Sequence, residues 1–251
     1  MTRSSFLALP VLALTLSSAH ATGLQDRLVM DLEWGAAWQE RNDVQSPHSA
    51  SGTRFALDGL TGRGPSSAPR VEVTWRLNAR DDLRWVAAPL RLDGQGALGT
   101  PVQFEGASFG SGATAAEYRF DSYRLTWRRT VLESPEWTVK AGVTGKIRDA
   151  QITLRQGSTS ASRSDTGFVP LLHLHAQRQL GERARLQFDG DGLASPRGRA
   201  FDLSLRYVHD FQRDLSGFVG VRLLDGGADN ASIYNFARFH YVTVGLSLKR
   251  F

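Results

Sequence analysis

An alternation of apolar and polar residues with a period of two recurs along this chain and is clearest over residues 200–225. The apolar positions are Phe201, Leu203, Leu205, Tyr207 and Phe211, and the positions between them carry Asp202, Ser204, Arg206 and Asp210. Because alternate side chains of a β-strand share a face, the segment predicts a strand with one apolar and one charged face. The alternation resumes at Leu215 after the polar step 212–214, which predicts a hairpin. Each strand is about eleven residues long, roughly the length at which a tilted strand crosses a bilayer.

Composition excludes a helical membrane protein. Hydrophobic residues make up 41% of the 251 residues, and no apolar run of about twenty residues follows the first segment of the chain. Any insertion into a membrane must therefore use strands. The chain has no cysteine, so it can form no disulfide, zinc–thiolate site or thiol nucleophile.

The net charge of +5 could suggest nucleic acid, but arginine occurs singly along strand-like segments rather than in a basic run. The sequence therefore does not favour nucleic-acid binding. Anionic lipopolysaccharide is the partner we expect for exposed Arg and Lys side chains.

Residues 1–21 have the pattern of a secretory signal peptide. Arg3 supplies the positive start, residues 6–16 the apolar centre, and Ala19-His20-Ala21 the cleavage site. We expect cleavage near Ala21, with residues 22–251 forming a single β-barrel domain.

The same alternation predicts about ten antiparallel strands, with eight or twelve as alternatives. The expected strands are residues 28–39, 71–78, 83–92, 120–131, 137–148, 168–180, 185–193, 201–211, 215–223 and 234–251. The phase of the alternation slips near Pro89, where a bulge or the end of pairing is expected. It switches again near Asp149, after which Ile152 and Leu154 are expected to lie beyond the lipid. Long connections are expected near residues 42–69, 93–117, 156–166 and 225–233, and short turns between them. This rhythm favours an all-β, up-and-down transmembrane barrel over a soluble β-sandwich, which has no reason to keep it.

The chain resembles the single-chain outer-membrane β-barrels of Gram-negative bacteria over essentially the whole of residues 22–251. It ends on the aromatic Phe251, and the runs DGDGLASPRGRAFD and DGGADNASIYNFARF are similar to uncharacterised members of this class. The resemblance implies a location in the bacterial outer membrane and insertion by the barrel-assembly machinery through Phe251. Val242, Val244 and the apolar positions after them are out of phase with Phe251, so either a bulge lies near residues 249–250 or the terminal signal is weak.

The most distinctive inward-facing group lies on the sixth and seventh expected strands. If residues 181–183 form a three-residue loop, His173 lies opposite Asp191 and His175 opposite Asp189. Such a ladder could bind a divalent metal or support general base chemistry. It could also simply neutralise charge in a filled lumen, and the sequence favours this second interpretation. We predict no metal and no cofactor.

Other inward positions are rich in charge, which favours a filled lumen. The basic ones are Arg76, Arg124, Arg128, Lys140, Lys146, Arg148, Arg206 and Arg222, and acidic ones include Glu33, Glu72 and Asp202. A barrel of about ten strands has a small interior that such side chains would largely fill. We therefore expect a plugged barrel with a structural or surface-interaction role, with a small-solute, anion-preferring channel as the alternative.

An enzyme is the third possibility. The omptin proteases resemble this chain in architecture and use paired aspartates and an Asp–His pair at the external rim, whereas Asp81-Asp82 and His209-Asp210 are expected at the periplasmic rim. Lipid A deacylases use a lipid-facing His and Ser, and no outward-facing His-x-Ser occurs here. We predict no catalytic residues, and a lipid- or peptide-modifying activity ranks last.

Overall fold

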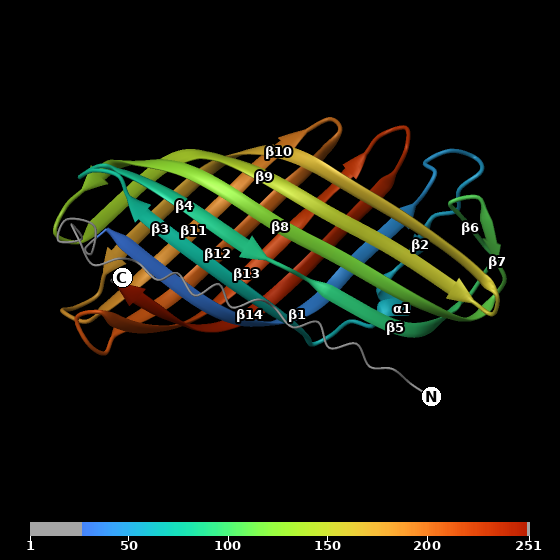
Figure 1. The fold of residues 1–251 in the computed structure, drawn as a ribbon, viewed down its shortest axis with the longest axis horizontal. Helices are drawn as coiled ribbons and strands as arrows, with labels where there is room; N and C mark the ends of the chain where they lie inside the picture. The colour runs from blue at the N-terminus through green and yellow to red at the C-terminus, as the bar shows by residue number, and fades with distance from the viewer. Residues whose placement is uncertain (1–26, 250–251) are drawn as a thin grey trace, which may run out of the picture.

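The computed structural model describes residues 27–249, which form a closed antiparallel barrel of ten strands (Figure 1). The wall consists of β1 (Leu28–Gln45), β3 (Ser66–Arg76), β4 (Asp81–Ala88), β8 (Gly112–Glu133), β9 (Trp137–Gln156), β10 (Thr159–Gln179), β11 (Ala184–Ser195), β12 (Gly198–Asp210), β13 (Leu215–Asp229) and β14 (Tyr234–Lys249). Pairing of β1 with β14 closes the ring. The predicted fold class and strand number are confirmed. No helix within residues 27–249 is long and apolar enough to span a membrane.

The two ends of the barrel differ. At one end, here called the turn end, short connections join β3 to β4, β8 to β9, β10 to β11 and β12 to β13. The start of β1 and the end of β14 also lie there, since Val29 pairs with Lys249. At the other end, here called the extended end, β8, β9 and β10 continue well past the neighbouring strands (Figure 1).

An apolar belt surrounds the barrel between these ends. Its exposed side chains include Leu32, Trp34, Trp38, Trp75, Trp85, Tyr123, Leu125, Trp127, Val143, Ile147, Phe168, Leu172, Leu205, Val219, Val221, Val242 and Val244. Towards the extended end the outward faces become charged, as Arg91 pairs with Asp121 and Arg119 with Asp149. Ion pairs on the outer face belong in water and exposed aliphatic side chains in lipid, so this change marks the edge of the bilayer on that side.

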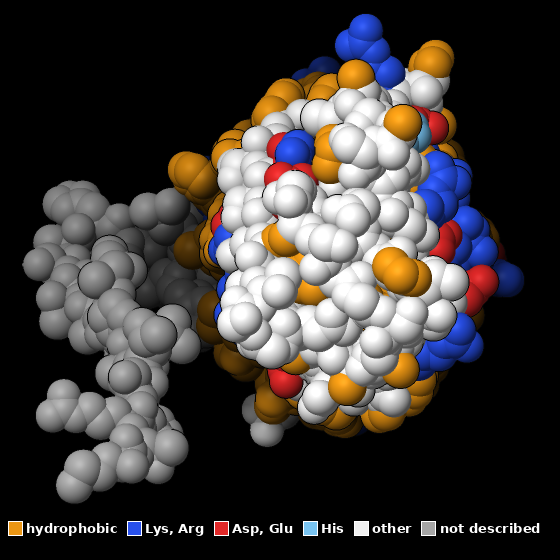
Figure 2. Space-filling model, turned by 90° about the vertical axis from the view of Figure 1, so that its right-hand side faces the viewer, with side chains coloured by type: hydrophobic (Ala, Val, Ile, Leu, Met, Phe, Trp, Pro, Cys, Tyr) orange, Lys and Arg blue, Asp and Glu red, His pale blue; other side chains and the backbone are white. Residues whose placement is uncertain are grey.

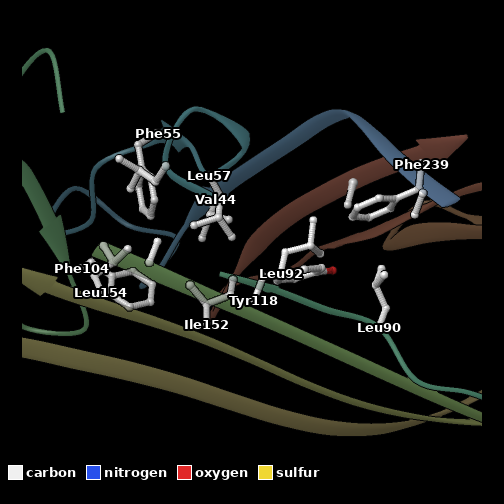
Figure 3. Close-up of a cluster of buried hydrophobic side chains, with 14 of the residues drawn as sticks. Val44, Phe55, Leu57, Leu90, Leu92, Phe104, Tyr118, Ile152, Leu154 and Phe239 are labelled. Carbon is white, nitrogen blue, oxygen red and sulfur yellow. The ribbon is translucent and has the colours of Figure 1, made fainter. Parts of the chain in front are cut away.

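Inside the extended end, the chain forms a hydrophobic core. The connection after β1 contains β2 (Phe55–Ala56) and α1 (Asp58–Thr61), and after β4 come β5 (Arg91–Leu98), β6 (Val102–Phe104) and β7 (Ala107–Phe109). Figure 3 shows their side chains meeting those of β8 and β9, with Phe55 edge-on to Phe104 at 5.9 Å and Leu154 beside them. Tyr118 stacks on Phe239 across the lumen, with ring centroids 6.1 Å apart. The long loops therefore fold inward and fill part of this end of the barrel, beside β8 and β9.

One expectation about this end is wrong. The loop predicted over residues 156–166 is a tight turn at Gly157 and Ser158 between two continuous strands, and Gly157 has a φ of 58°. The switch of phase near Asp149 involves no bulge, because pairing of β8 with β9 is regular from Ala115 to Thr130. The apparent change of phase arises because the inside of the barrel turns apolar above the belt while the outside turns polar.

Other sequence expectations have mixed outcomes. The break at Pro89 is confirmed, since β4 ends at Ala88 and β5 begins at Arg91. Much of the loops predicted over 42–69, 93–117 and 225–233 is strand, and the connection from β11 to β12 is short. Within residues 27–249, only the connections after β1 and after β4 are long, so the two ends differ in these two connections and in strand length. The signal peptide, its cleavage site and Phe251 lie outside the described residues.

We predict that Leu154→Ala loosens the extended end selectively. Leu154 is fully buried among the loop side chains, and removing such a side chain costs about 2–5 kcal/mol. Trypsin cleavage of the folded protein within residues 91–165 should become at least about tenfold faster, whereas Arg155→Ala, an exposed neighbour, should leave the rate within about twofold. Equal rates for both variants would contradict a packed core at this end.

Candidate functional site

The ladder predicted on β10 and β11 is present. The Leu180 amide donates to the Ala184 carbonyl at 2.9 Å, and the register pairs His173 with Asp191 and His175 with Asp189. The Nδ1 atom of His173 lies 2.8 Å from an Asp191 oxygen, and that of His175 lies 3.0 Å from an Asp189 oxygen. All four side chains are buried inside the barrel.

Arginines from the opposite wall reach across the lumen to these aspartates. Arg124 of β8 donates to Asp191 of β11 at 3.0 Å and also bonds to Asp202 of β12. The Asp202 carboxylate is held from its other side by Arg222, whose Nε and Nη2 atoms donate at 2.7 and 2.6 Å. Arg128 lies 3.3 Å from Asp189. Strands that are not neighbours in the sheet are thus joined through the interior.

A second set of pairs completes this layer on the β1, β3 and β4 side. Glu72 receives two hydrogen bonds from Arg84, at 2.6 and 2.8 Å. Arg206 of β12 reaches Glu33 of β1 at 2.6 Å. Arg84 and Arg70 are not among the predicted lumen residues. Arg70 alternates with the predicted inward residue Glu72, whereas no inward position was predicted on the strand that carries Arg84.

We call these buried side chains the charged layer. They are Glu33, Arg70, Glu72, Arg84, Arg124, Arg128, His173, His175, Asp189, Asp191, Asp202, Arg206 and Arg222. A buried charge is stable only with a partner and hydrogen bonds, and each carboxylate of the layer lies beside a cation. The layer fills the middle of the lumen.

The remaining predicted basic residues lie outside the layer. Arg76 is exposed at the turn end, and Lys140 pairs there with Asp82. Arg148 pairs with Asp165 near the extended end. Lys146 faces inward but makes no hydrogen bond or ion pair with any residue in the part of the chain described.

Each side of the charged layer has a cavity. The one at the turn end has a volume of about 680 Å³ and polar walls that include Asp31, Asp82, Lys140, His175 and Gln177. The one towards the extended end has a volume of about 480 Å³ and walls from β8 to β14 that are mainly apolar. A view onto the extended end shows no open pore (Figure 2).

Beyond the belt, Asp225 joins two neighbouring strands at the rim of the extended end. Arg199 and Arg238 donate to its oxygens at 3.1 and 3.2 Å. Partial burial raises the pKa of this carboxyl, but the two hydrogen bonds outweigh burial and hold the pKa below its ordinary value. Asp225 therefore stays charged at neutral pH and fixes both arginines.

A metal site in the ladder would need several donor atoms free to coordinate the ion. Among residues 27–249, no three or more His, Asp or Glu side chains are grouped so as to hold an ion. Asp191 illustrates why, because its oxygens already accept from Arg124, Thr144 and His173.

The carboxylate pairs considered for protease chemistry lie at the turn end, as predicted. Asp81 accepts from Arg129 at 2.8 Å, and Asp210 accepts from Arg185 at 2.7 Å. Both acids belong to ion pairs between neighbouring strands.

Comparisons with known proteins support the fold. No protein-family model and no curated protein sequence matches the chain. Among solved structures, it is similar to the outer membrane protease OmpT of Escherichia coli, with a TM-score of 0.58 at 8% identity over 90% of this chain and 97% of that one. It also matches Ail, the attachment invasion locus protein of Yersinia pestis, with a TM-score of 0.42 at 8% identity over 88% and 99% of the two chains. The translocator domain of the autotransporter NalP of Neisseria meningitidis matches with a TM-score of 0.35 at 10% identity over 90% of each chain.

The likeness to OmpT concerns the fold alone at this identity. Together with the closed ring of ten strands and the apolar belt, it identifies the chain as a β-barrel of the outer-membrane type.

We predict that Arg124→Met is strongly destabilising. The substitution removes the cation that Asp191 and Asp202 share, and breaking a buried pair costs about 3–5 kcal/mol. Arg129→Met is the matched control, because this arginine lies on the same strand in a half-exposed pair worth about 1 kcal/mol or less. Urea unfolding of the barrel in lipid vesicles, followed by tryptophan fluorescence, measures both. Similar midpoints for the two variants would contradict a role for the layer in stability.

Proposed function

We propose that the protein is a non-conducting outer-membrane barrel with a structural or surface-interaction role. In this proposal residues 1–21 are removed on export, the turn end faces the periplasm, and the extended end faces the exterior. The observation that carries it is the charged layer, in which Arg124 and Arg206 cross the lumen to carboxylates on other strands. A solute would have to separate these pairs to pass.

The extended end supports the surface role. Its strands rise past the belt, and the core around Leu154 and Phe104 holds them as a rigid projection. Strands that served only to span the membrane would end at the belt. A packed projection instead offers a fixed surface to partners outside the cell.

Two partners form part of the proposal. Cationic side chains near the rim, among them Arg197 and Arg238, suit the anionic groups of lipopolysaccharide. The barrel-assembly machinery would recognise the terminal Phe251, as the resemblance in sequence suggests.

Single-channel recording tests the proposal. The mature chain, shown to be folded by heat-modifiable gel mobility, should give no discrete current steps in a planar bilayer. The double variant Arg124→Ala with Arg206→Ala should give steps if it folds, because it removes two of the cations that cross the lumen. Reproducible anion-preferring steps from the unmodified protein would overturn the proposal and favour the channel.

A further inference from the structure

The cavity towards the extended end opens sideways through the wall. β10 pairs with β9 along its whole length, from Thr159 to Arg178, but it pairs with β11 only from Leu172 to Gln179. Residues 159–171 of β10 therefore form an edge that is paired with no strand on the β11 side, within the described part of the sheet. Pro170 lies at the start of this edge, and proline, which lacks an N–H group, is confined to such unpaired positions in sheets.

The unpaired edge of β10 leaves a gap between β10 and the end of β11, and the cavity reaches this gap. The walls of the cavity include inward-facing Gly167 and Val169 of β10, outward-facing Phe168 and Pro170 of the same strand, and Leu193 of β11. A cavity lined by both faces of one strand continues around that strand's edge. Phe168 is 70% exposed and belongs to the apolar belt, so the gap opens at the level of the lipid.

The inner part of the cavity is apolar. Tyr118 and Phe120 of β8 and Phe239 of β14 form its walls together with Leu224. Its volume of about 480 Å³ falls within the range of about 300–1,000 Å³ usual for small-molecule sites. Such walls suit a hydrocarbon chain better than a sugar or an ion.

Lys146 is the most deeply buried of the charged side chains that line the cavity. Its side chain is only 4% exposed and lines the cavity, with Nζ 5.0 Å from the centre of the Phe120 ring. Arg148 and Arg199, which also line the cavity, have carboxylate partners in Asp165 and Asp225. Lys146 has none among residues 27–249, and a buried ammonium without an anion is costly.

We propose that this cavity binds a long-chain carboxylic acid that enters from the membrane through the gap between β10 and β11. The carboxylate pairs with the Lys146 ammonium, and the chain lies along Tyr118, Phe120 and Phe239 towards Phe168. This occupant supplies the missing anion and fills the apolar walls, whereas an ester-linked lipid tail would supply only the hydrocarbon. Binding does not depend on whether the barrel conducts.

Photocrosslinking tests this site. The probe is hexadecanoic acid carrying a diazirine near the end of its chain, added to the folded protein in lipid nanodiscs. Peptides containing residues 118–120, 168–170 or 239 should be labelled, and excess unlabelled hexadecanoic acid should compete. Labelling confined to other parts of the belt would overturn the proposal.

Two lysine variants isolate the role of the charge. Lys146→Met should reduce labelling by at least about tenfold, the effect expected of one charge-assisted hydrogen bond. Lys140→Met, on the same strand but at the turn-end cavity, should label like the unmodified protein. Equal labelling of the Lys146 and Lys140 variants would overturn the assignment of the carboxylate.

Two further comparisons keep the test decisive if Lys146→Met does not fold. Val169→Trp should abolish labelling by filling the cavity. The alcohol with the same chain and diazirine should label the unmodified protein at least about tenfold less than the acid. Equal labelling by acid and alcohol would show a site for any hydrocarbon chain and would overturn the proposal.

Discussion

The pairing of charges inside a narrow barrel constrains the rest of this structure. Strands that turn one face to lipid must turn the other face inward, and here that face carries arginines and carboxylates in nearly every strand. Ten strands leave little room, so most of these charges pair with a charge on another strand. Arg124 and Arg206 reach across the lumen to carboxylates on other strands, so ion pairs inside the barrel hold its walls together.

The charged layer also divides the interior into unlike compartments. Below it, the turn-end cavity is polar and contains further ion pairs such as Lys140 with Asp82. Above it, the walls become apolar, and part of the space is filled by loop side chains around Leu57 and Phe104. The rest is the cavity beside Lys146. A gap in the wall connects this cavity to the lipid, so the extended end combines a rigid projection with a site open to the membrane.

Much of this architecture could be predicted from local sequence. The alternation over 201–223 fixes which side chains face lipid, and the three-residue loop 181–183 fixes the register that brings His173 to Asp191. Period-two patterns and loop lengths are properties of a few adjacent residues. The same alternation predicted the members of the charged layer, except for Arg70 and Arg84, which lie at the edges of the predicted strands.

What could not be predicted depends on contacts between distant segments. The stretch 156–166 reads as a loop because it is rich in serine, yet it is strand because Ile152 and Leu154 pack against Leu57 and Phe104 from other loops. That Lys146 has no ion-pair partner among residues 27–249 could not be predicted either, because the residues across the barrel decide whether a carboxylate lies near it. The gap beside β10 depends on where β11 ends relative to it.

Sidedness of thiol labelling tests the central claim most directly, because the chain has no cysteine of its own. Thr138 lines the cavity at the turn end and Ala150 lines the cavity at the extended end, both on β9. With oriented barrels in sealed vesicles, a small membrane-impermeant maleimide should label Thr138→Cys only from the turn side and Ala150→Cys only from the extended side. Labelling of either cysteine from both sides would show that the charged layer does not close the lumen.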